Sequence, residues 1–456
     1  MSGSVNARAG ASPSERPEET AAFFDLVRVF ARIGCLSFGG PAAQIALMHK
    51  AVVDERHWLS EERFLHALSY CMLLPGPEAQ QLATYIGWLK HGVRGGIVAG
   101  LLFVLPGLFV IICLSTLYAL FQDAGWLAGL FFGLKAAVLT IVLEAVIRLA
   151  HRTLKTRFLL GLAIAAFVGL FVLGLPFPLV VLVAALAGFI HARWLPAPAE
   201  TPEPVSAESR RVSLGRSLLS LAFWVFVWQL PFLVLLAMAG AENLAAMFAF
   251  FSKMALVTFG GAYAVLAYVA QVAVQDYGWL RPGEMLDGLA LAETTPGPLV
   301  LVLSYVGYLV GFRTVPGLDP VVGGILGACL TAWATFVPSF IWIFAGAPYI
   351  ERLRGRPQIS AALSAITAAV VGVIANLALW FALHVLFAEV RRLPLVPGWT
   401  GEGAPGLWWP TVATLDPAAL GLFLVSALLL LRLKIGLVKV LLACALAGLL
   451  WRLAGF

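Results

Sequence analysis

Long apolar runs recur throughout this 456-residue chain and decide its fold class. They continue for about 20 residues, the length that a helix needs to cross the hydrocarbon core of a bilayer. Hydrophobic residues make up 61% of the chain and charged residues 12%, the latter about half the charged fraction of a soluble domain. Membrane barrels use shorter, alternating segments of about 10 residues instead. The sequence therefore predicts an all-α, polytopic membrane protein.

An internal repeat divides the chain into two halves. At an offset of 221 positions, Phe38-Gly39-Gly40 matches Phe259-Gly260-Gly261, and Pro75-Gly76-Pro77 matches Pro296-Gly297-Pro298. After small insertions, a second matching block follows at an offset of 232. Two gap-free blocks joined by loops of different length indicate a duplicated unit rather than chance similarity.

A polar linker and one extra apolar run separate the two repeats. If each repeat crosses the membrane an even number of times, one added span turns the second repeat upside down. The predicted division is a disordered tail over 1–21, an N-terminal repeat over 22–194, a cytoplasmic linker over 195–216, a linking transmembrane helix over 217–239 and a C-terminal repeat over 240–456.

The charges of the loops also indicate inversion. The loop near Asp123 lacks Lys and Arg, whereas the equivalent loop of the second half carries Arg352, Arg354 and Arg356. Because basic loops stay in the cytoplasm, equivalent loops must face opposite sides. We predict two inverted-topology repeats with broken or re-entrant helices, about 13 transmembrane segments and a cytoplasmic N-terminus. In the first repeat, the apolar runs predict spans over 22–50, 64–91, 95–121, 127–149, 158–174 and 177–193. The segments that hold the Phe-Gly-Gly and Pro-Gly-Pro motifs either cross the membrane or re-enter.

The Phe-Gly-Gly and Pro-Gly-Pro motifs interrupt predicted helices and indicate a binding site. Glycine leaves helical geometry easily, and proline is favoured at the first position of a new helix. Each helix start offers unpaired N–H groups and a positive dipole end, which together bind anions. Close helix packing is the alternative explanation for such glycines. The occurrence of both motifs at the same spacing in both halves favours a transporter site near the membrane midplane.

Ionisable residues in the apolar segments narrow the choice of ligand. Arg32 precedes the first break and Lys253 the second, which favours an anion; the alternative is a snorkelling side chain near a helix end. Lys135 and Glu144 project to opposite faces of one predicted span, so each needs another partner or water. Glu78 lies in the first turn after a Pro-Gly-Pro motif, where the helix dipole stabilises its anion.

These considerations give a set of candidate residues. The substrate-binding candidates are Arg32, Ser37, Phe38, Gly39, Gly40, Pro75, Gly76, Pro77, Gln81, Lys253, Thr258, Phe259, Gly260, Gly261, Pro296, Gly297 and Pro298. The candidates for proton coupling or charge pairing are Glu78, Lys135, Glu144 and Glu293. No cofactor and no metal site is predicted, because the five cysteines are scattered singly.

The same motifs resemble a known family. The stretches FARIGCLSFGGP (30–41), LLPGPEAQQLATYIGW (73–88) and RGGIVAGLLFVLPG (94–107) resemble the long-chain chromate ion transporters, the CHR family, and TFGGAYAVL (258–266) and TTPGP (294–298) resemble its C-terminal domain. The resemblance implies chromate efflux across the bacterial inner membrane and chromate resistance. Sulfate, a similar tetrahedral dianion, is then the expected competitor.

Two other functions are alternatives to chromate transport. A transporter of sulfate or another oxyanion is the nearer alternative. An intramembrane enzyme acting on a lipid-linked phosphate is disfavoured, because the sequence contains no H-E-x-x-H and no G-x-S-x-G motif. We therefore predict no enzymatic activity. Basic loops account for the net charge of +6, so no nucleic acid is expected as a partner. The lipid bilayer is the expected surrounding, and a homodimer is a candidate assembly.

Overall fold

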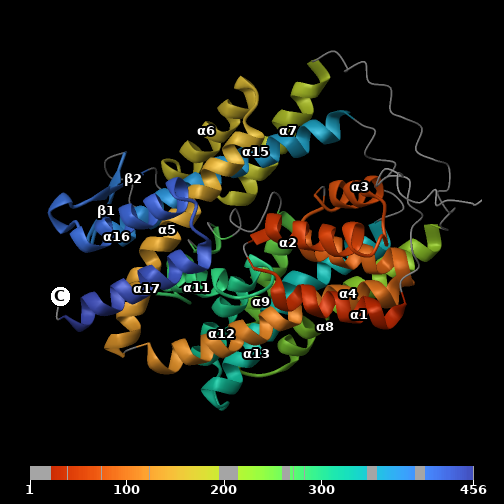
Figure 1. Ribbon diagram of the computed structural model, residues 1–456, viewed down its shortest axis with the longest axis horizontal. Helices are drawn as coiled ribbons and strands as arrows, with labels where there is room; N and C mark the ends of the chain where they lie inside the picture. Colours follow the sequence, from red (N-terminus) through yellow and green to blue (C-terminus); the bar gives the residue numbers. More distant parts are fainter. Residues whose placement is uncertain are drawn as a thin grey trace, which may run out of the picture.

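In a computed structural model, the chain is an α-helical membrane protein, as the sequence predicts (Figure 1). Among the described residues, five helices are long and apolar enough to cross a bilayer, and four shorter apolar helices accompany them. The count of about 13 segments stays a prediction. The structure describes residues 22–38, 40–72, 74–122, 124–194, 214–258, 266, 268–270, 272–281, 283–346, 357–395 and 406–454.

The regular elements described in the N-terminal repeat are all helices. Its later helices follow the predicted spans 127–149, 158–174 and 177–193 closely, with ends that differ by a few residues. In chain order, its elements are α1 (Phe23–Leu36), α2 (Gly40–His49), the π-helical turn η2 (Lys50–Asp54), α3 (Glu61–Cys71), α4 (Glu78–Phe121), α5 (Gly125–Thr153), α6 (Arg157–Phe171) and α7 (Phe177–Trp194).

The C-terminal half repeats this order after the linking helix. The predicted run 217–239 forms α8 (Leu214–Ala237). Then follow α9 (Glu242–Val257), η3 (Val272–Asp276), α11 (Glu284–Glu293), η4 (Leu299–Leu301), α12 (Val302–Thr314), α13 (Pro320–Ile341), η5 (Trp342–Gly346), α15 (Pro357–Leu386), β1 (Val390–Pro394), β2 (Gly406–Pro410), η6 (Val412–Thr414), α16 (Pro417–Ala427), η7 (Leu428–Arg432) and α17 (Leu437–Leu453).

The predicted spans 22–50 and 64–91 are interrupted rather than continuous. The first is divided between α1 and α2, and the second between α3 and the start of α4. Helix α1 has 14 residues and α3 has 11. At about 1.5 Å per residue, such helices reach only part of the way across a hydrocarbon core of about 30 Å. The motifs therefore end half-length helices inside the protein.

Helix α4 is itself two antiparallel helices. His91 and Gly92 leave helical geometry, and Gly92 has a φ of +60°. The two arms then pack closely, because a Cβ on Gly87 would collide with the carbonyl oxygen of Gly95. Residues 78–90 thus return from the Pro-Gly-Pro loop to one face of the protein, and residues 93–121 form the long arm that crosses it.

The first break lies halfway along this long arm. The ring of Phe23 at the start of α1 contacts that of His91 with centroids 5.4 Å apart. Further along, a Cβ on Gly34 would collide with the carbonyl oxygen of Leu102. Helix α1 therefore runs parallel to the long arm of α4. Its end at Ser37 lies level with about the middle of that arm.

Equivalent helices of the two repeats run antiparallel. A Cβ on Gly100 would lie 2.9 Å from the ring of Phe340, and one on Gly96 would lie 2.6 Å from the ring of Phe344. The segment formed by α13 and η5 is the equivalent of the long arm of α4 at offset 232. Along these contacts, residue numbers rise in α13 and η5 while they fall in the long arm, so the two helices are antiparallel. This is the packing that the predicted inverted repeats require.

A second bundle lies beside α4 and α13. It contains α6, α7 and α15, at the top of Figure 1, and α5, α16 and α17, at its left. Small residues allow close approach, and a Cβ on Gly133 of α5 would collide with backbone of Cys444 in α17. One small feature differs from an all-α chain, since β1 and β2 form an antiparallel hairpin in which Arg392 pairs with Trp408.

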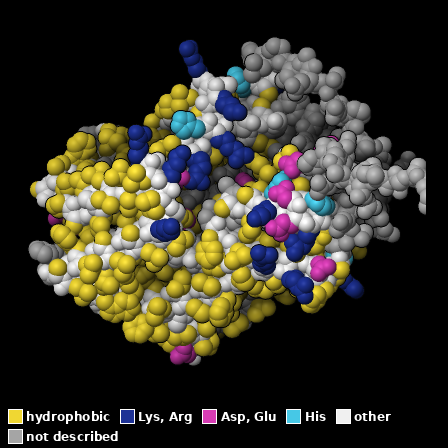
Figure 2. Space-filling view, viewed as in Figure 1, with side chains coloured by type: hydrophobic (Ala, Val, Ile, Leu, Met, Phe, Trp, Pro, Cys, Tyr) yellow, Lys and Arg dark blue, Asp and Glu magenta, His cyan; other side chains and the backbone are white. Residues whose placement is uncertain are grey.

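Apolar side chains cover much of the face drawn in Figure 2.

Candidate functional site

Each of the two Pro-Gly-Pro loops lies at the centre and is hydrogen-bonded to the helix break of the other repeat. The N–H of Gly76 donates to the carbonyl oxygen of Thr258 at 2.8 Å, and the N–H of Gly297 donates to that of Ser37 at 2.7 Å. The offset of 221 relates both the two donors and the two acceptors. The bonds are therefore equivalent by an approximate two-fold axis, and they hold the two halves of the centre together.

Glycine is needed at both loops because of the backbone conformation. The φ angle is +118° at Gly76 and +102° at Gly297, a region that residues with a Cβ rarely adopt. Gly40, at the start of α2, has a φ of +78°. The chain can therefore end one half-helix and begin another within a few residues, as the motifs predict.

The helices that follow the loops begin without a side-chain cap. The N-cap residue is Pro77 for α4 and Pro298 for η4, and neither provides a side-chain hydrogen bond. The N–H groups of a first helical turn have no partner within the helix. Both helix starts therefore present N–H groups and a positive dipole end toward the loops, which is favourable for an anion.

Buried polar side chains surround the loops without satisfying all their atoms. Ser37 is 1% exposed and Gln81 is 0% exposed. The Gln81 amide donates to the carbonyl oxygen of Pro75 at 2.7 Å, and the Gln44 amide donates to that of Gly297 at 2.6 Å. The atoms here without a hydrogen-bond partner among the described residues are Ser37 Oγ, Gln44 Oε1, Gln80 Oε1, Gln81 Oε1 and Ser339 Oγ. Most buried polar atoms in proteins are paired, so this cluster indicates a polar ligand or water.

A second equivalent pair lines the same loops. Gly107 and Ser339, each following a proline, correspond at offset 232. A Cβ on Gly107 would collide with the carbonyl oxygen of Pro296, while the hydroxyl of Ser339 lies 3.5 Å from a Cβ built on Gly76. Each long helix therefore packs against the loop of the opposite repeat. The exchange of glycine for serine makes the two halves of the centre chemically different.

The candidate cations lie beside this centre rather than within it. Arg32 and Lys253 are exposed, and each stands five residues before its break, at Ser37 and Thr258 respectively. That spacing is about 7.5 Å along a helix. The Thr258 hydroxyl donates to the carbonyl oxygen of Met254 at 2.6 Å. Among the other candidates, Phe38 is 39% exposed, and Gly39, Phe259, Gly260 and Gly261 lie outside the described residues.

The candidate carboxylates lie in different surroundings. Glu78 is half-buried in the first turn of α4. Glu144 forms an ion pair with Arg148, four residues along the same helix, which favours charge pairing for this residue. Glu293 is 6% exposed and ends α11, directly before the second loop.

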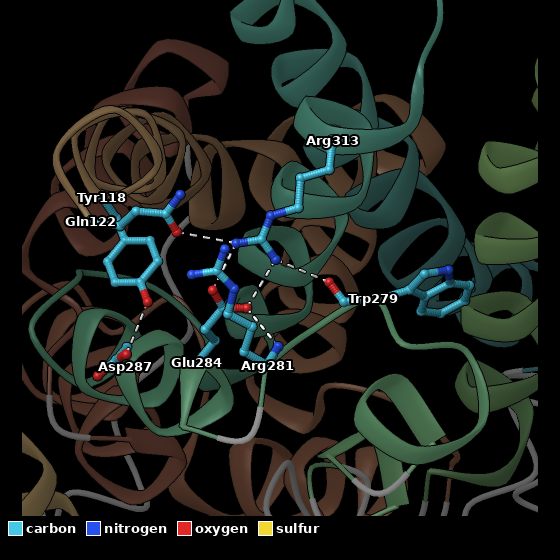
Figure 3. Close-up of polar contacts among 7 residues, drawn as sticks. All are labelled: Tyr118, Gln122, Trp279, Arg281, Glu284, Asp287 and Arg313. Atoms are coloured by element: carbon cyan, nitrogen blue, oxygen red, sulfur yellow. Dashed lines mark hydrogen bonds and ion pairs between the residues drawn. The ribbon is translucent and has the colours of Figure 1, made fainter.

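A charged network next to α11 was not predicted from the sequence. Lys135 Nζ lies 3.2 Å from Oδ1 of Asp287, and the Tyr118 hydroxyl donates to Oδ2 of Asp287 at 3.0 Å. Arg313 donates to both oxygens of Glu284, at 2.7 and 2.9 Å. Figure 3 shows Tyr118 reaching Asp287 while Arg313 bridges Glu284, Gln122 and the Trp279 carbonyl. This network holds α11 to α4, α5 and α12.

The signal for this network was present in the sequence but incomplete. Glu284 and Asp287 are three residues apart, which places them on one face of a helix whose other charged residue is Glu293. Their partners come from distant positions, and Lys135 is in the other repeat. Only the packing of α5 against α11 identifies that partner.

Comparison with known proteins assigns the family. The model of the chromate transporter family matches residues 24–189 and 245–449. The chain belongs to this family. A chromate transport protein of Pseudomonas aeruginosa is 33% identical over 351 residues, which cover 76% of this chain and 77% of the relative. A probable chromate transport protein of Synechococcus elongatus is 29% identical over 369 residues, covering 77% and 82% respectively.

A further relative, a chromate transport protein of Cupriavidus metallidurans, is 29% identical over 358 residues, covering 76% of this chain and 80% of the relative. No solved structure matches the chain. The resemblance to chromate transporters is thus confirmed, and with it a multi-pass membrane protein of a transport family.

Proposed function

We propose that this protein exports chromate across the bacterial inner membrane through a pseudo-symmetric site at the membrane midplane. The observation that carries the proposal is the pair of equivalent hydrogen bonds from Gly76 to Thr258 and from Gly297 to Ser37. Each bond joins a Pro-Gly-Pro loop to the helix break of the opposite repeat, at Ser37 or Thr258. Irregular backbone at membrane depth is tolerated where it is buried in protein or lines a wet cavity.

The groups around the loops suit a tetrahedral oxyanion. A dianion that leaves water needs hydrogen-bond donors in place of its hydration shell. The hydroxyls of Ser37 and Ser339 are buried without partners among the described residues, and the uncapped helix starts after Pro77 and Pro298 add backbone N–H groups. Arg32 and Lys253 are exposed beside the breaks and raise the local concentration of anions.

The membrane potential favours movement of chromate out of the cell. One charge moved through 100 mV changes the free energy by about 2.3 kcal/mol, so a dianion gains about twice that amount. Because the cell interior is negative, chromate leaves the cell downhill without a coupled ion. Proton antiport is therefore not required, and Glu78 is the central carboxylate to test for it.

The test is chromate flux into or out of vesicles that contain the purified full-length protein. A potential is imposed by a potassium gradient and an ionophore, with and without a pH gradient. We expect potential-driven chromate flux that excess sulfate reduces by competition for the same donors. Flux of sulfate without flux of chromate would replace chromate by sulfate as the substrate. No flux of either oxyanion by folded protein would refute the proposal.

A further inference from the structure

A pocket of about 380 Å³ lies beside the charged network, away from the two Pro-Gly-Pro loops. Its lining includes Tyr118, Gln122, Lys135, Asp287 and Arg452, so it lies between α4, α5, α11 and α17. The volume is within the range of about 300–1,000 Å³ found for small-molecule sites. By the predicted topology, the pocket opens on the outer side of the membrane, because Gln122 belongs to the loop without Lys or Arg.

Lys135 presents its ammonium group at the start of a helix. Its Nζ lies 3.1 Å from the position of a Cβ on Gly283, the N-cap of α11, so the absence of a side chain there leaves room for it. The ammonium is 3.2 Å from Asp287, somewhat longer than the roughly 2.7–2.9 Å of a strong charge-assisted bond. Lys135 is 29% exposed at the side chain whereas Asp287 is 6% exposed. The ammonium can therefore be reached from the pocket.

The neighbouring carboxylates, Glu284 and Asp416, already accept hydrogen bonds from other groups. Glu284 accepts two bonds from Arg313 and one from the backbone N–H of Arg281. Asp416 caps α16 by accepting from the N–H groups of residues 418 and 419. The groups that face or approach Asp287 are Lys135 on α5, Tyr118 on α4, Tyr305 and Arg313 on α12, Glu284 on α11 itself, and the pocket residues Asp416 and Arg452.

The charge balance depends on Asp287. Among the described residues, four charged side chains line the pocket: Lys135 and Arg452 are positive, and Asp287 and Asp416 are negative, so their sum is zero. If Asp287 takes up a proton, the sum becomes +1 and Lys135 loses its competing carboxylate. The Tyr118 hydroxyl still accompanies Asp287. An oxyanion then gains an ammonium, a guanidinium and the positive end of α11.

We propose that this pocket is a second oxyanion site, at the outer mouth of the protein, and that anion binding there is linked to protonation of Asp287. The inference rests on the proposed function, since it gives the exported anion a place to pause before release. The bound anion replaces Asp287 as the ion-pair partner of Lys135. The carboxylate of Asp287 then binds one proton from solvent. No other bond is made or broken.

The test uses sulfate as the probe, with purified full-length protein in detergent and titration calorimetry. Measurements in two buffers with different ionisation enthalpies give the number of protons taken up with each sulfate. We expect uptake that approaches one proton for each sulfate bound in the pocket. In Asp287→Asn, which mimics the protonated carboxyl, sulfate still binds and the linked uptake disappears.

The cation is tested by the double variant Lys135→Gln/Asp287→Asn. It leaves no buried carboxylate without its partner, so it avoids the destabilisation expected of Lys135→Gln alone. We expect its affinity for sulfate in the pocket to fall by at least about tenfold, since a charged donor is lost. Lys439→Gln, at an exposed position on α17, should bind as the wild type does.

The results separate the two proposals. Wild-type affinity for sulfate in the double variant would overturn the second site and leave chromate transport untouched. Proton uptake that persists in Asp287→Asn would overturn the role of that carboxylate. Failure of the wild type to transport any oxyanion in vesicles would instead refute the proposed function, whatever the calorimetry shows.

Discussion

Replacing Gly76 by alanine tests whether the bonded Pro-Gly-Pro loops form the transport site. The φ of +118° places this residue where a Cβ is strained. The added Cβ would also lie 2.9 Å from Nε2 of Gln81, the atom that donates to the carbonyl oxygen of Pro75. Because Gln81 is fully buried, its amide cannot move aside without losing that bond.

The magnitude follows from these two effects. A residue other than glycine held in a sparsely populated backbone region costs about 1–3 kcal/mol. Loss of one hydrogen bond adds about 1 kcal/mol. The expected destabilisation is therefore about 2–4 kcal/mol. If only about 1.4 kcal/mol of this acts on the substrate-bound state, chromate flux falls about tenfold.

The assay is chromate flux in vesicles, normalised to inserted protein, together with thermal unfolding in detergent. Gly297→Ala is the equivalent change in the other repeat, with a φ of +102° and a Cβ 3.1 Å from Leu301, and we expect a loss of similar size. Gly92→Ala is the control. Its φ is +60° and its ψ is −152°, but a Cβ there meets nothing within 4 Å, so strain of about 1–3 kcal/mol is added without a contact to the loops.

Comparison of the three variants can refute the role of the loops in transport. Wild-type flux and stability in Gly76→Ala would show that the loop tolerates a Cβ and that its geometry does not determine transport. An equal loss of flux in Gly92→Ala would show that strain anywhere in α4 is enough. Either result would remove the loops from the proposed mechanism.

Two further predictions concern charge and packing. Arg32→Gln and Lys253→Gln should each reduce chromate flux severalfold and weaken its dependence on ionic strength, while a folded Arg32→Gln protein with normal transport would contradict a role in anion attraction. Gly311→Ala should lower the melting temperature and the yield, because its Cβ would collide with the carbonyl oxygen of Gly323 and separate α12 from α13. Gly125→Ala, where a Cβ meets nothing within 4 Å, should change neither; equal melting temperatures for the two variants would contradict the packing argument.

The local sequence pattern was sufficient to predict the main helices and the positions where helices are interrupted. Runs of apolar residues predicted α5, α6, α7 and α8 with ends close to those observed. The Pro-Gly-Pro motifs predicted interruptions, and glycines with positive φ are found there. The sequence left undecided whether span 64–91 crosses the membrane or re-enters, because a half-helix and a full helix have the same composition over ten residues. The structure shows a break after α3 and a turn at Gly92.

The sequence by itself determined the membrane class, the duplication and the residue types that can break a helix. These depend on composition, on spacing along the chain and on backbone conformations that one residue favours alone. Only the tertiary structure decided which groups meet. Gly76 finds Thr258 and Lys135 finds Asp287 because inverted repeats bring positions about 150 to 180 residues apart into contact. A hydrogen bond or an ion pair depends on distance in space, which the order of residues does not state.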